Sequence, residues 1–285
     1  MTETVPSHRC WIMPSLDLLL RRLLVVLISS SCLFIASTFA NEIAPSQEPV
    51  TRRDTAHCDA NQFRVAIDVG HTPEAPGATS ARGVTEYAFN LRLARSIQKK
   101  LVGGGFLLTN LISLAGSGRA PLIARSDSAN ALGVNLFLSV HHDSVQPIYL
   151  SHWDYEGRTR TFSDRFSGYS LFVSLRNDAA AASLTFAKLF ARELSTRKLQ
   201  FTMHHAENIP GERRPLLDRD LGIYRYDSLA VLMNTRAPAV LFEAGVIVNR
   251  RDELLLSSPE YQGRISDAAL SAVNEFCGVQ SAGGR

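Results

Sequence analysis

Two short apolar runs restrict the fold of this 285-residue chain more than any other feature. VAIDV, at residues 65–69, and LFLSV, at residues 136–140, are apolar at all but one position each. A strand that is apolar on both faces belongs in a sheet that is covered on each side. Between such runs the chain carries apolar residues at helical spacing. The sequence therefore predicts an α/β fold, with a twisted, mostly parallel sheet and helices on both of its faces.

The same patterns predict the individual elements within a single domain at residues 61–280. Apolar runs bounded by turn residues predict strands at 64–69, 105–109, 136–140, 169–174 and 239–243. Apolar residues spaced by three and four predict helices at 85–101, 121–132, 180–194 and 259–276.

The first 40 residues differ in kind from the rest of the chain. Arginines precede the apolar run LLVVLISSSCLFIASTFA, which ends in small residues before Asn41. This order is typical of a signal peptide, so we expect a periplasmic or secreted protein that meets the membrane only during export. A membrane anchor is the alternative, although the serines and Thr38 make the run a poor one. Residues 41–60 are polar, contain prolines and predict a flexible tether.

Cleavage after Ala40 would leave Cys58 and Cys277 in the mature chain. An oxidising compartment favours a disulfide between these two ends of the domain, whereas two unrelated buried thiols are the alternative. The formal net charge is +3, and acidic and basic residues are interspersed without a basic run. This pattern gives no indication of nucleic-acid binding.

Residues able to bind a metal or move a proton follow three of the predicted strands. His71 follows the first, His141 and His142 extend the second, and Glu243 ends the last, while Glu86 lies in the first turn of a predicted helix. Ligand sites of such sheets lie outside the carboxyl ends of the strands. We therefore expect these side chains to meet at one edge of the sheet.

Two histidines and one glutamate satisfy the ligand preference of a catalytic zinc ion, which keeps a further position open for water. Each residue alone also has a structural interpretation. A strand-end histidine is commonly held by hydrogen bonds, and the helix dipole favours a glutamate such as Glu86 without any function. Glu243 is harder to explain in this way, because a carboxylate that ends an apolar strand needs partners or a task.

Four ordered blocks carry a more specific signal: AIDVGH, GVTEYAFNLRLARSIQKKL, RSDSANALGVNLFLSVHHDS and PAVLFEAGVIVNRRDELLLSSPEYQGRISDAALSAV. Together they resemble the amidase-3 family of zinc-dependent N-acetylmuramoyl-L-alanine amidases. The resemblance implies one zinc ion bound by His71, Glu86 and His141, with Glu243 as the catalytic residue. It also implies that peptidoglycan is the substrate.

In the implied reaction, zinc-activated water hydrolyses the amide between N-acetylmuramic acid and L-alanine of the stem peptide, and Glu243 carries the proton from the water to the leaving amine. Two alternatives stay open. A zinc peptidase acting on another amide would share every ligand, and a catalytically silent peptidoglycan-binding module would need no base such as Glu243.

The chain departs from the family pattern at several positions. Val69-Gly70-His71 stands where Pro-Gly-His is usual, and His142 follows the third ligand where a small residue is common. His142 could therefore replace His141 or bind substrate. Thr109-Asn110 also stands where the family has a threonine-arginine pair, which indicates altered loop chemistry.

Two segments lie outside the shared blocks. Residues 146–168 are rich in aromatic residues and arginines, and three interpretations stay open: a substrate-binding wall, an ordered surface insertion, or a gate. The gate follows relatives in which a regulatory segment covers the zinc until a protein activator displaces it. Residues 203–225 include His204, His205 and Glu207, which indicate either a second metal site or a solvated loop.

Overall fold

The structure, a computed structural model, describes residues 58–283. The predicted signal peptide and most of the predicted tether lie outside these residues. The described chain contains, in order, β1 Val65–Val69, α1 Glu86–Gly103, β2 Thr109–Ile112, α2 Arg119–Leu132, β3 Leu136–Asp143, η1 Pro147–Tyr149, β4 Ser151–Tyr155, β5 Arg158–Phe162, β6 Ser170–Val173, α3 Ala180–Thr196, η2 His204–Ala206, β7 Leu216–Asp218, β8 Ile223–Arg225, α4 Ala230–Asn234, β9 Ala239–Val246, α5 Arg250–Ser257 and α6 Pro259–Gly283.

A seven-stranded sheet runs in the order β2-β1-β3-β9-β6-β8-β7. β2, β1, β3 and β9 are parallel neighbours, whereas β6 is antiparallel to β9 and β7 is antiparallel to β8. The predicted α/β fold with a mostly parallel sheet is therefore confirmed. The parallel part places the carboxyl ends of β1, β3 and β9 at one edge.

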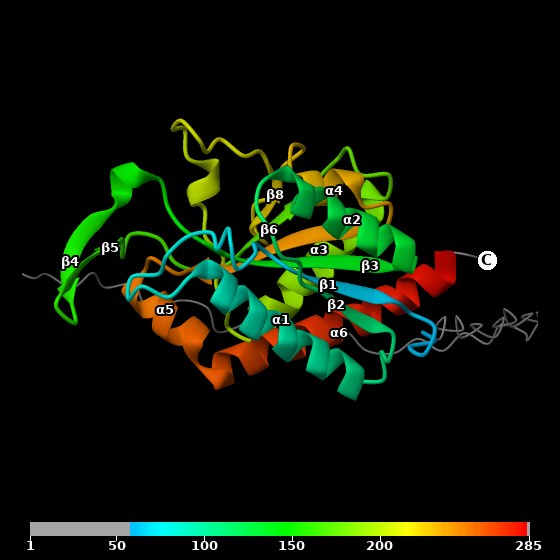
Figure 1. Cartoon of the computed structure of the whole chain (residues 1–285). Helices are drawn as coiled ribbons and strands as arrows, with labels where there is room; N and C mark the ends of the chain where they lie inside the picture. Colours follow the sequence, from blue (N-terminus) through cyan, green and yellow to red (C-terminus); the bar gives the residue numbers. More distant parts are fainter. Residues whose placement is uncertain (1–57, 284–285) are drawn as a thin grey trace, which may run out of the picture. The chain divides into compact units, whose positions relative to one another are not determined.

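Helices cover both faces of this sheet, as predicted (Figure 1). α1, α3 and α6 lie on one face, and α2 and α4 on the other. β1 explains the arrangement, because Val65, Ile67 and Val69 join the core cluster beneath the first group of helices, whereas Ala66 joins the second cluster. No helix in residues 58–283 is long and apolar enough to span a bilayer.

One predicted strand is misplaced. Residues 105–109 were expected to form it, but β2 begins only at Thr109. Gly105 has a positive φ of 99°, and the amide of Phe106 donates to the carbonyl oxygen of Leu101. The apolar residues that indicated a strand there instead close the turn after α1.

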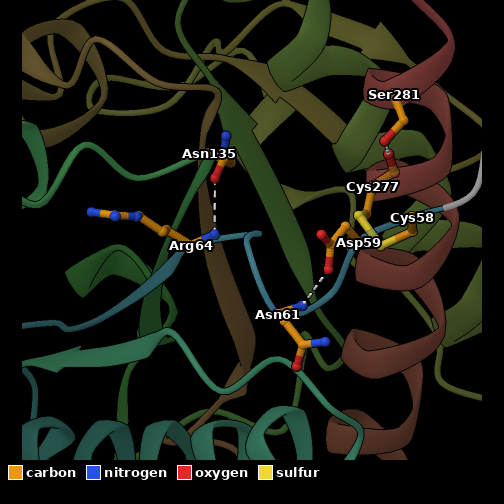
Figure 2. The surroundings of a disulfide bond; sticks show 7 residues. All are labelled: Cys58, Asp59, Asn61, Arg64, Asn135, Cys277 and Ser281. Carbon is orange, nitrogen blue, oxygen red and sulfur yellow. Dashed lines mark hydrogen bonds between the residues drawn. A yellow bond between two sulfur atoms is a disulfide. The ribbon is translucent and has the colours of Figure 1, made fainter.

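The two cysteines form a disulfide that joins the segment before β1 to α6 (Figure 2). Cys277 is buried and belongs to the main core cluster, and Cys58 packs against it. The prediction of a bridge between the two ends of the domain is confirmed. Residues 58–60, expected at the end of the tether, are therefore fastened to the domain.

Residues 146–168 contain η1 and the antiparallel hairpin β4–β5. The ring of Trp153 stacks on Tyr155, and its Nε1 donates to the carbonyl oxygen of Ala81 at 3.0 Å. Near the base of the hairpin, Asp164 pairs with Arg250 of α5. Figure 1 draws the hairpin beside α5 and away from α2 and α4. The segment is ordered, and both stacking of its own aromatic residues and contacts with Ala81 and Arg250 hold it in place.

Candidate active site

Three predicted residues, His71, Glu86 and His141, converge at the carboxyl ends of β1 and β3. Glu86, the first residue of α1, reaches back between the two histidines. Its Oε2 lies 3.0 Å from Nε2 of His71, and its Oε1 lies 3.0 Å from Nδ1 of His141. One potential ligand atom from each residue lies within 4.8 Å of the others. This donor set, with two imidazole nitrogens and one carboxylate oxygen, suits a zinc ion.

Backbone conformation makes this convergence feasible. His71 has a positive φ of 65°, which is uncommon outside glycine. A Cβ at Gly70 would overlap the imidazole of His141, and one at Gly77 would overlap both Glu86 and His71. Glycines at these two positions therefore let the three side chains approach each other.

Asn90, one helical turn after Glu86, holds the group from the α1 side. Its Nδ2 donates to Oε1 of Glu86 at 3.2 Å and to the carbonyl oxygen of Gly70 at 3.1 Å. Its Oδ1 lies 2.7 Å from Nδ1 of His142. His142 is buried and belongs to this hydrogen-bond network; it is not part of the converging group, and burial lowers its pKa to about 3.

Arg125 of α2 holds the turn that carries His71. Its guanidinium donates to the carbonyl oxygen of Val69 at 2.6 Å and to that of His71. The same guanidinium lies 3.3 Å from the buried carboxylate of Asp68. Sequence reasoning missed Asn90 and Arg125. Each is a polar residue at a position where the helical spacing of α1 or α2 predicts a buried side chain, and this mismatch could have identified it.

The charge of Glu86 is stabilised by its neighbours. Burial acts to raise its pKa, but hydrogen bonds from His141 and His71 outweigh burial and hold the pKa well below its usual value. An ionised carboxylate is the form that binds a metal.

Glu243 lies on β9, opposite His141 in the register of the neighbouring strand β3. Its Oε2 is buried and has no hydrogen-bond partner within residues 58–283. Burial raises its pKa well above the usual value, and the nearby carboxylates of Asp143 and Glu86 raise it further. Unlike Glu86, this carboxyl group therefore has a raised affinity for a proton.

A cavity of about 370 Å³ opens beside the two histidines. His71 and His141 form part of its wall, and most of the remainder is apolar, including Pro121, Leu229 and Val231. Its lining includes no residue of 146–168. The arrangement places a candidate metal-binding group beside a cavity, with the carboxyl group of Glu243 on the neighbouring strand; Glu243 does not line the cavity itself.

Comparison with known proteins agrees with this arrangement. The model of the N-acetylmuramoyl-L-alanine amidase family matches residues 65–275. The chain belongs to this family. The match confirms the resemblance in the sequence and the amidase activity on peptidoglycan that it implied, and it does not favour the alternative functions.

Individual relatives are distant. A protein of Buchnera aphidicola subsp. Schizaphis graminum in the same family is 24% identical over 227 residues, which cover 74% of this chain and 94% of the relative. Ami1 of Mycobacterium smegmatis has a TM-score of 0.57 at 19% identity, covering 78% of this chain and 99% of its own. CwlD of Clostridioides difficile, solved with the GerS lipoprotein, has a TM-score of 0.56 at 17% identity, covering 76% and 99%. The two solved structures support the fold.

Proposed function

We propose that this amidase depends on zinc bound by His71, Glu86 and His141, and that Glu243 is its catalytic residue. The substrate bond is the amide between N-acetylmuramic acid and L-alanine of the peptidoglycan stem peptide. The observation that carries the proposal is the convergence of the three candidate ligands within 4.8 Å, beside a cavity and one strand from Glu243.

The donor set fits a catalytic zinc ion in both number and type. Three protein ligands leave a coordination position for water or substrate. A zinc ion held there would supply Lewis-acid activation of water and of the scissile carbonyl. Asn90 supports the fit, because it fixes the carboxylate of Glu86, and hydrogen bonds of this kind orient metal ligands.

Glu243 has the properties of a residue that moves a proton. Its raised pKa lets it accept a proton from the attacking water and hold it long enough to deliver it to the leaving amine of L-alanine. Its Oε2 has no hydrogen-bond partner in the described part of the chain, so one oxygen of the carboxyl group is free for this transfer. The largely apolar cavity wall would hold the substrate while limiting the access of bulk water.

We extend the proposal to the cellular setting. A peptidoglycan substrate and the signal-peptide pattern in residues 1–40 together favour export to the periplasm or the exterior. The proposal also includes a protein that activates the enzyme, because the structurally similar CwlD was solved in complex with the GerS lipoprotein.

The test is mass analysis of the products released from purified peptidoglycan sacculi, with and without chelator. We expect free stem peptides that begin at L-alanine, their loss with chelator and their return with zinc. Release that is unaffected by chelator would remove zinc from the proposal. Intact sacculi at full zinc loading would indicate that an activator is required, and cleavage of another amide would support the peptidase alternative.

A further inference from the structure

A second cluster of histidines and carboxylates lies at the end of β3. Asp143 is the last residue of that strand, and His204 and His205 come from η2, some sixty residues later in the chain. Nε2 of His205 lies 2.8 Å from Oδ2 of Asp143, and Nε2 of His204 lies 3.1 Å from the same oxygen. The three atoms lie within 4.8 Å of one another.

These three converging atoms are buried and lack hydrogen bonds within the described residues, despite the short distances between them. The side chain of His204 is 2% exposed, so solvent does not satisfy it. Buried polar atoms of this kind are rare, and each requires an explanation such as a bound ion.

The opposite nitrogen of each imidazole is already engaged. Nδ1 of His205 lies 3.0 Å from Oε2 of Glu212, and Nδ1 of His204 lies 2.9 Å from the hydroxyl oxygen of Thr202. Glu212 is itself fixed by a 2.7 Å hydrogen bond from Gln146. Carboxylates and hydroxyls that bind the distal nitrogen of a histidine are typical of metal sites, where they orient the ring toward the ion.

An aromatic shell surrounds the two imidazoles. The ring of Phe166 stacks on His204 with centroids 5.0 Å apart, and Phe172 packs edge-on against His205 at 4.9 Å. Tyr224 lies on another side of His205 at 5.4 Å. A shell of this kind restricts solvent access and stabilises a metal site in a fixed geometry.

We propose that Asp143, His204 and His205 bind a second divalent metal ion of the zinc class, which fastens residues 202–212 to the end of β3. One carboxylate oxygen and two imidazole nitrogens are ligands that zinc accepts. Glu207, which the sequence suggested as a third ligand, is not in the cluster. Its Oε1 lies 3.6 Å from Nη2 of Arg165. The proposal is independent of the amidase mechanism, because it concerns a different set of ligands.

The rival explanation is a metal-free ion pair. Burial lowers the pKa of His205, but the charges of Asp143 and Glu212 and the hydrogen bond with Glu212 raise it to about 9. An imidazolium would then lie between Asp143 and Glu212. The two explanations differ in metal stoichiometry, which can be measured without any assay of hydrolysis.

The experiment loads the purified full chain with zinc after chelation and counts bound ions by elemental mass spectrometry. We expect two ions in the native protein, one in His71→Ala, one in His205→Ala and none in the double variant. His152→Ala is the matched control, because this histidine is exposed on β4, and it should retain two ions. Circular dichroism verifies folding of each variant.

If His205→Ala does not fold, Glu212→Gln provides the second variant, since it keeps all three ligands and removes only the bond that orients His205. We expect it to bind the second ion about 10–100-fold more weakly. An anomalous diffraction peak among Asp143, His204 and His205 would locate the ion. One ion in the native protein, with none in His71→Ala, would overturn the proposal, as would two ions in a folded His205→Ala.

Discussion

The two metal-binding candidates offer the same kinds of ligand atom, two imidazole nitrogens and one carboxylate oxygen, in different settings. His71, Glu86 and His141 lie beside a cavity, and the His71 side chain is 33% exposed. The second candidate comprises Asp143, His204 and His205, and aromatic rings pack against its two histidines, whose side chains are 2% and 11% exposed. His71, Glu86 and His141 thus form an open cluster, and Asp143, His204 and His205 form a closed cluster.

One strand, β3, contributes a residue to each cluster. β3 supplies His141 to the open cluster and, two residues later, Asp143 to the closed cluster. Catalytic metal sites keep a coordination position accessible, whereas structural sites are closed. We therefore expect the open cluster to govern turnover and the closed cluster to govern the order of the segment around η2.

The largest effect is expected from His71→Ala, which removes a ligand of the open cluster. A metal ion contributes several kcal/mol to transition-state stabilisation, so hydrolysis of sacculi should fall by roughly 10³-fold or more. His152→Ala serves as the control. Turnover at the native rate in His71→Ala would break the assignment of the open cluster to catalysis.

A smaller loss is expected from Glu243→Gln, which keeps the shape of the side chain but cannot accept the proton. General acid–base catalysis contributes about 10²–10⁴-fold, and turnover should fall within that range. Metal stoichiometry should remain that of the native protein, because Glu243 belongs to neither ligand set. Loss of an ion would show instead that Glu243 is a ligand.

A matched pair of substitutions sharpens the comparison further. Asn90→Ala removes the support of Glu86, and Glu212→Gln removes the support of His205. Each should weaken one ion by about 10–100-fold and leave the other unchanged. Competition with a chromogenic chelator measures both affinities. Equal weakening of both ions by either substitution would mean that the clusters do not act separately.

The smallest effect is expected on the free energy of unfolding, from the ion pair between Asp164 and Arg250, which lies outside both clusters. The hydrogen bond from Arg250 lowers the pKa of Asp164 below its unfolded value of 3.8. A lowered pKa stabilises the folded protein above pH 3.8, and this contribution disappears as the pH falls through the folded pKa. The pair is partly exposed, so its contribution is about 0.2–1 kcal/mol.

Urea unfolding of the native protein and Asp164→Asn, measured between pH 7 and pH 2, tests this expectation. The two free energies of unfolding should differ at pH 7 and converge at the acidic end. A difference that persists at pH 2 would assign the effect to packing of the hairpin and not to the charge of Asp164.

The open cluster was predictable because each of its residues follows an apolar strand or begins a helix, and parallel strands bring such positions together. Its supports were not, since Asn90 and Arg125 resemble ordinary helix residues until their partners are known. The closed cluster was predicted only in part: the sequence indicated His204 and His205 as possible metal ligands but not Asp143. Asp143 meets His204 only through the fold, whereas local spacing pointed to Glu207.

The fold shows the same division. The buried strands VAIDV and LFLSV were predictable because they are apolar on both faces. β5, with the sequence RTRTF, has few apolar residues, and among the strands of residues 58–283 it pairs with β4 alone, in an exposed hairpin. Its strand conformation depends on that partner, and the sequence of 146–168 alone therefore indicated a connection.

The disulfide between Cys58 and Cys277 changes how the domain would respond to a mechanical load. A pull on the chain that precedes residue 58 reaches the covalent bridge before it reaches β1. The force then passes into α6, which packs along α1 and α3, and it does not peel β1 from the sheet. Both strand ends that carry His71 and His141 therefore lie off the direct line of such a load.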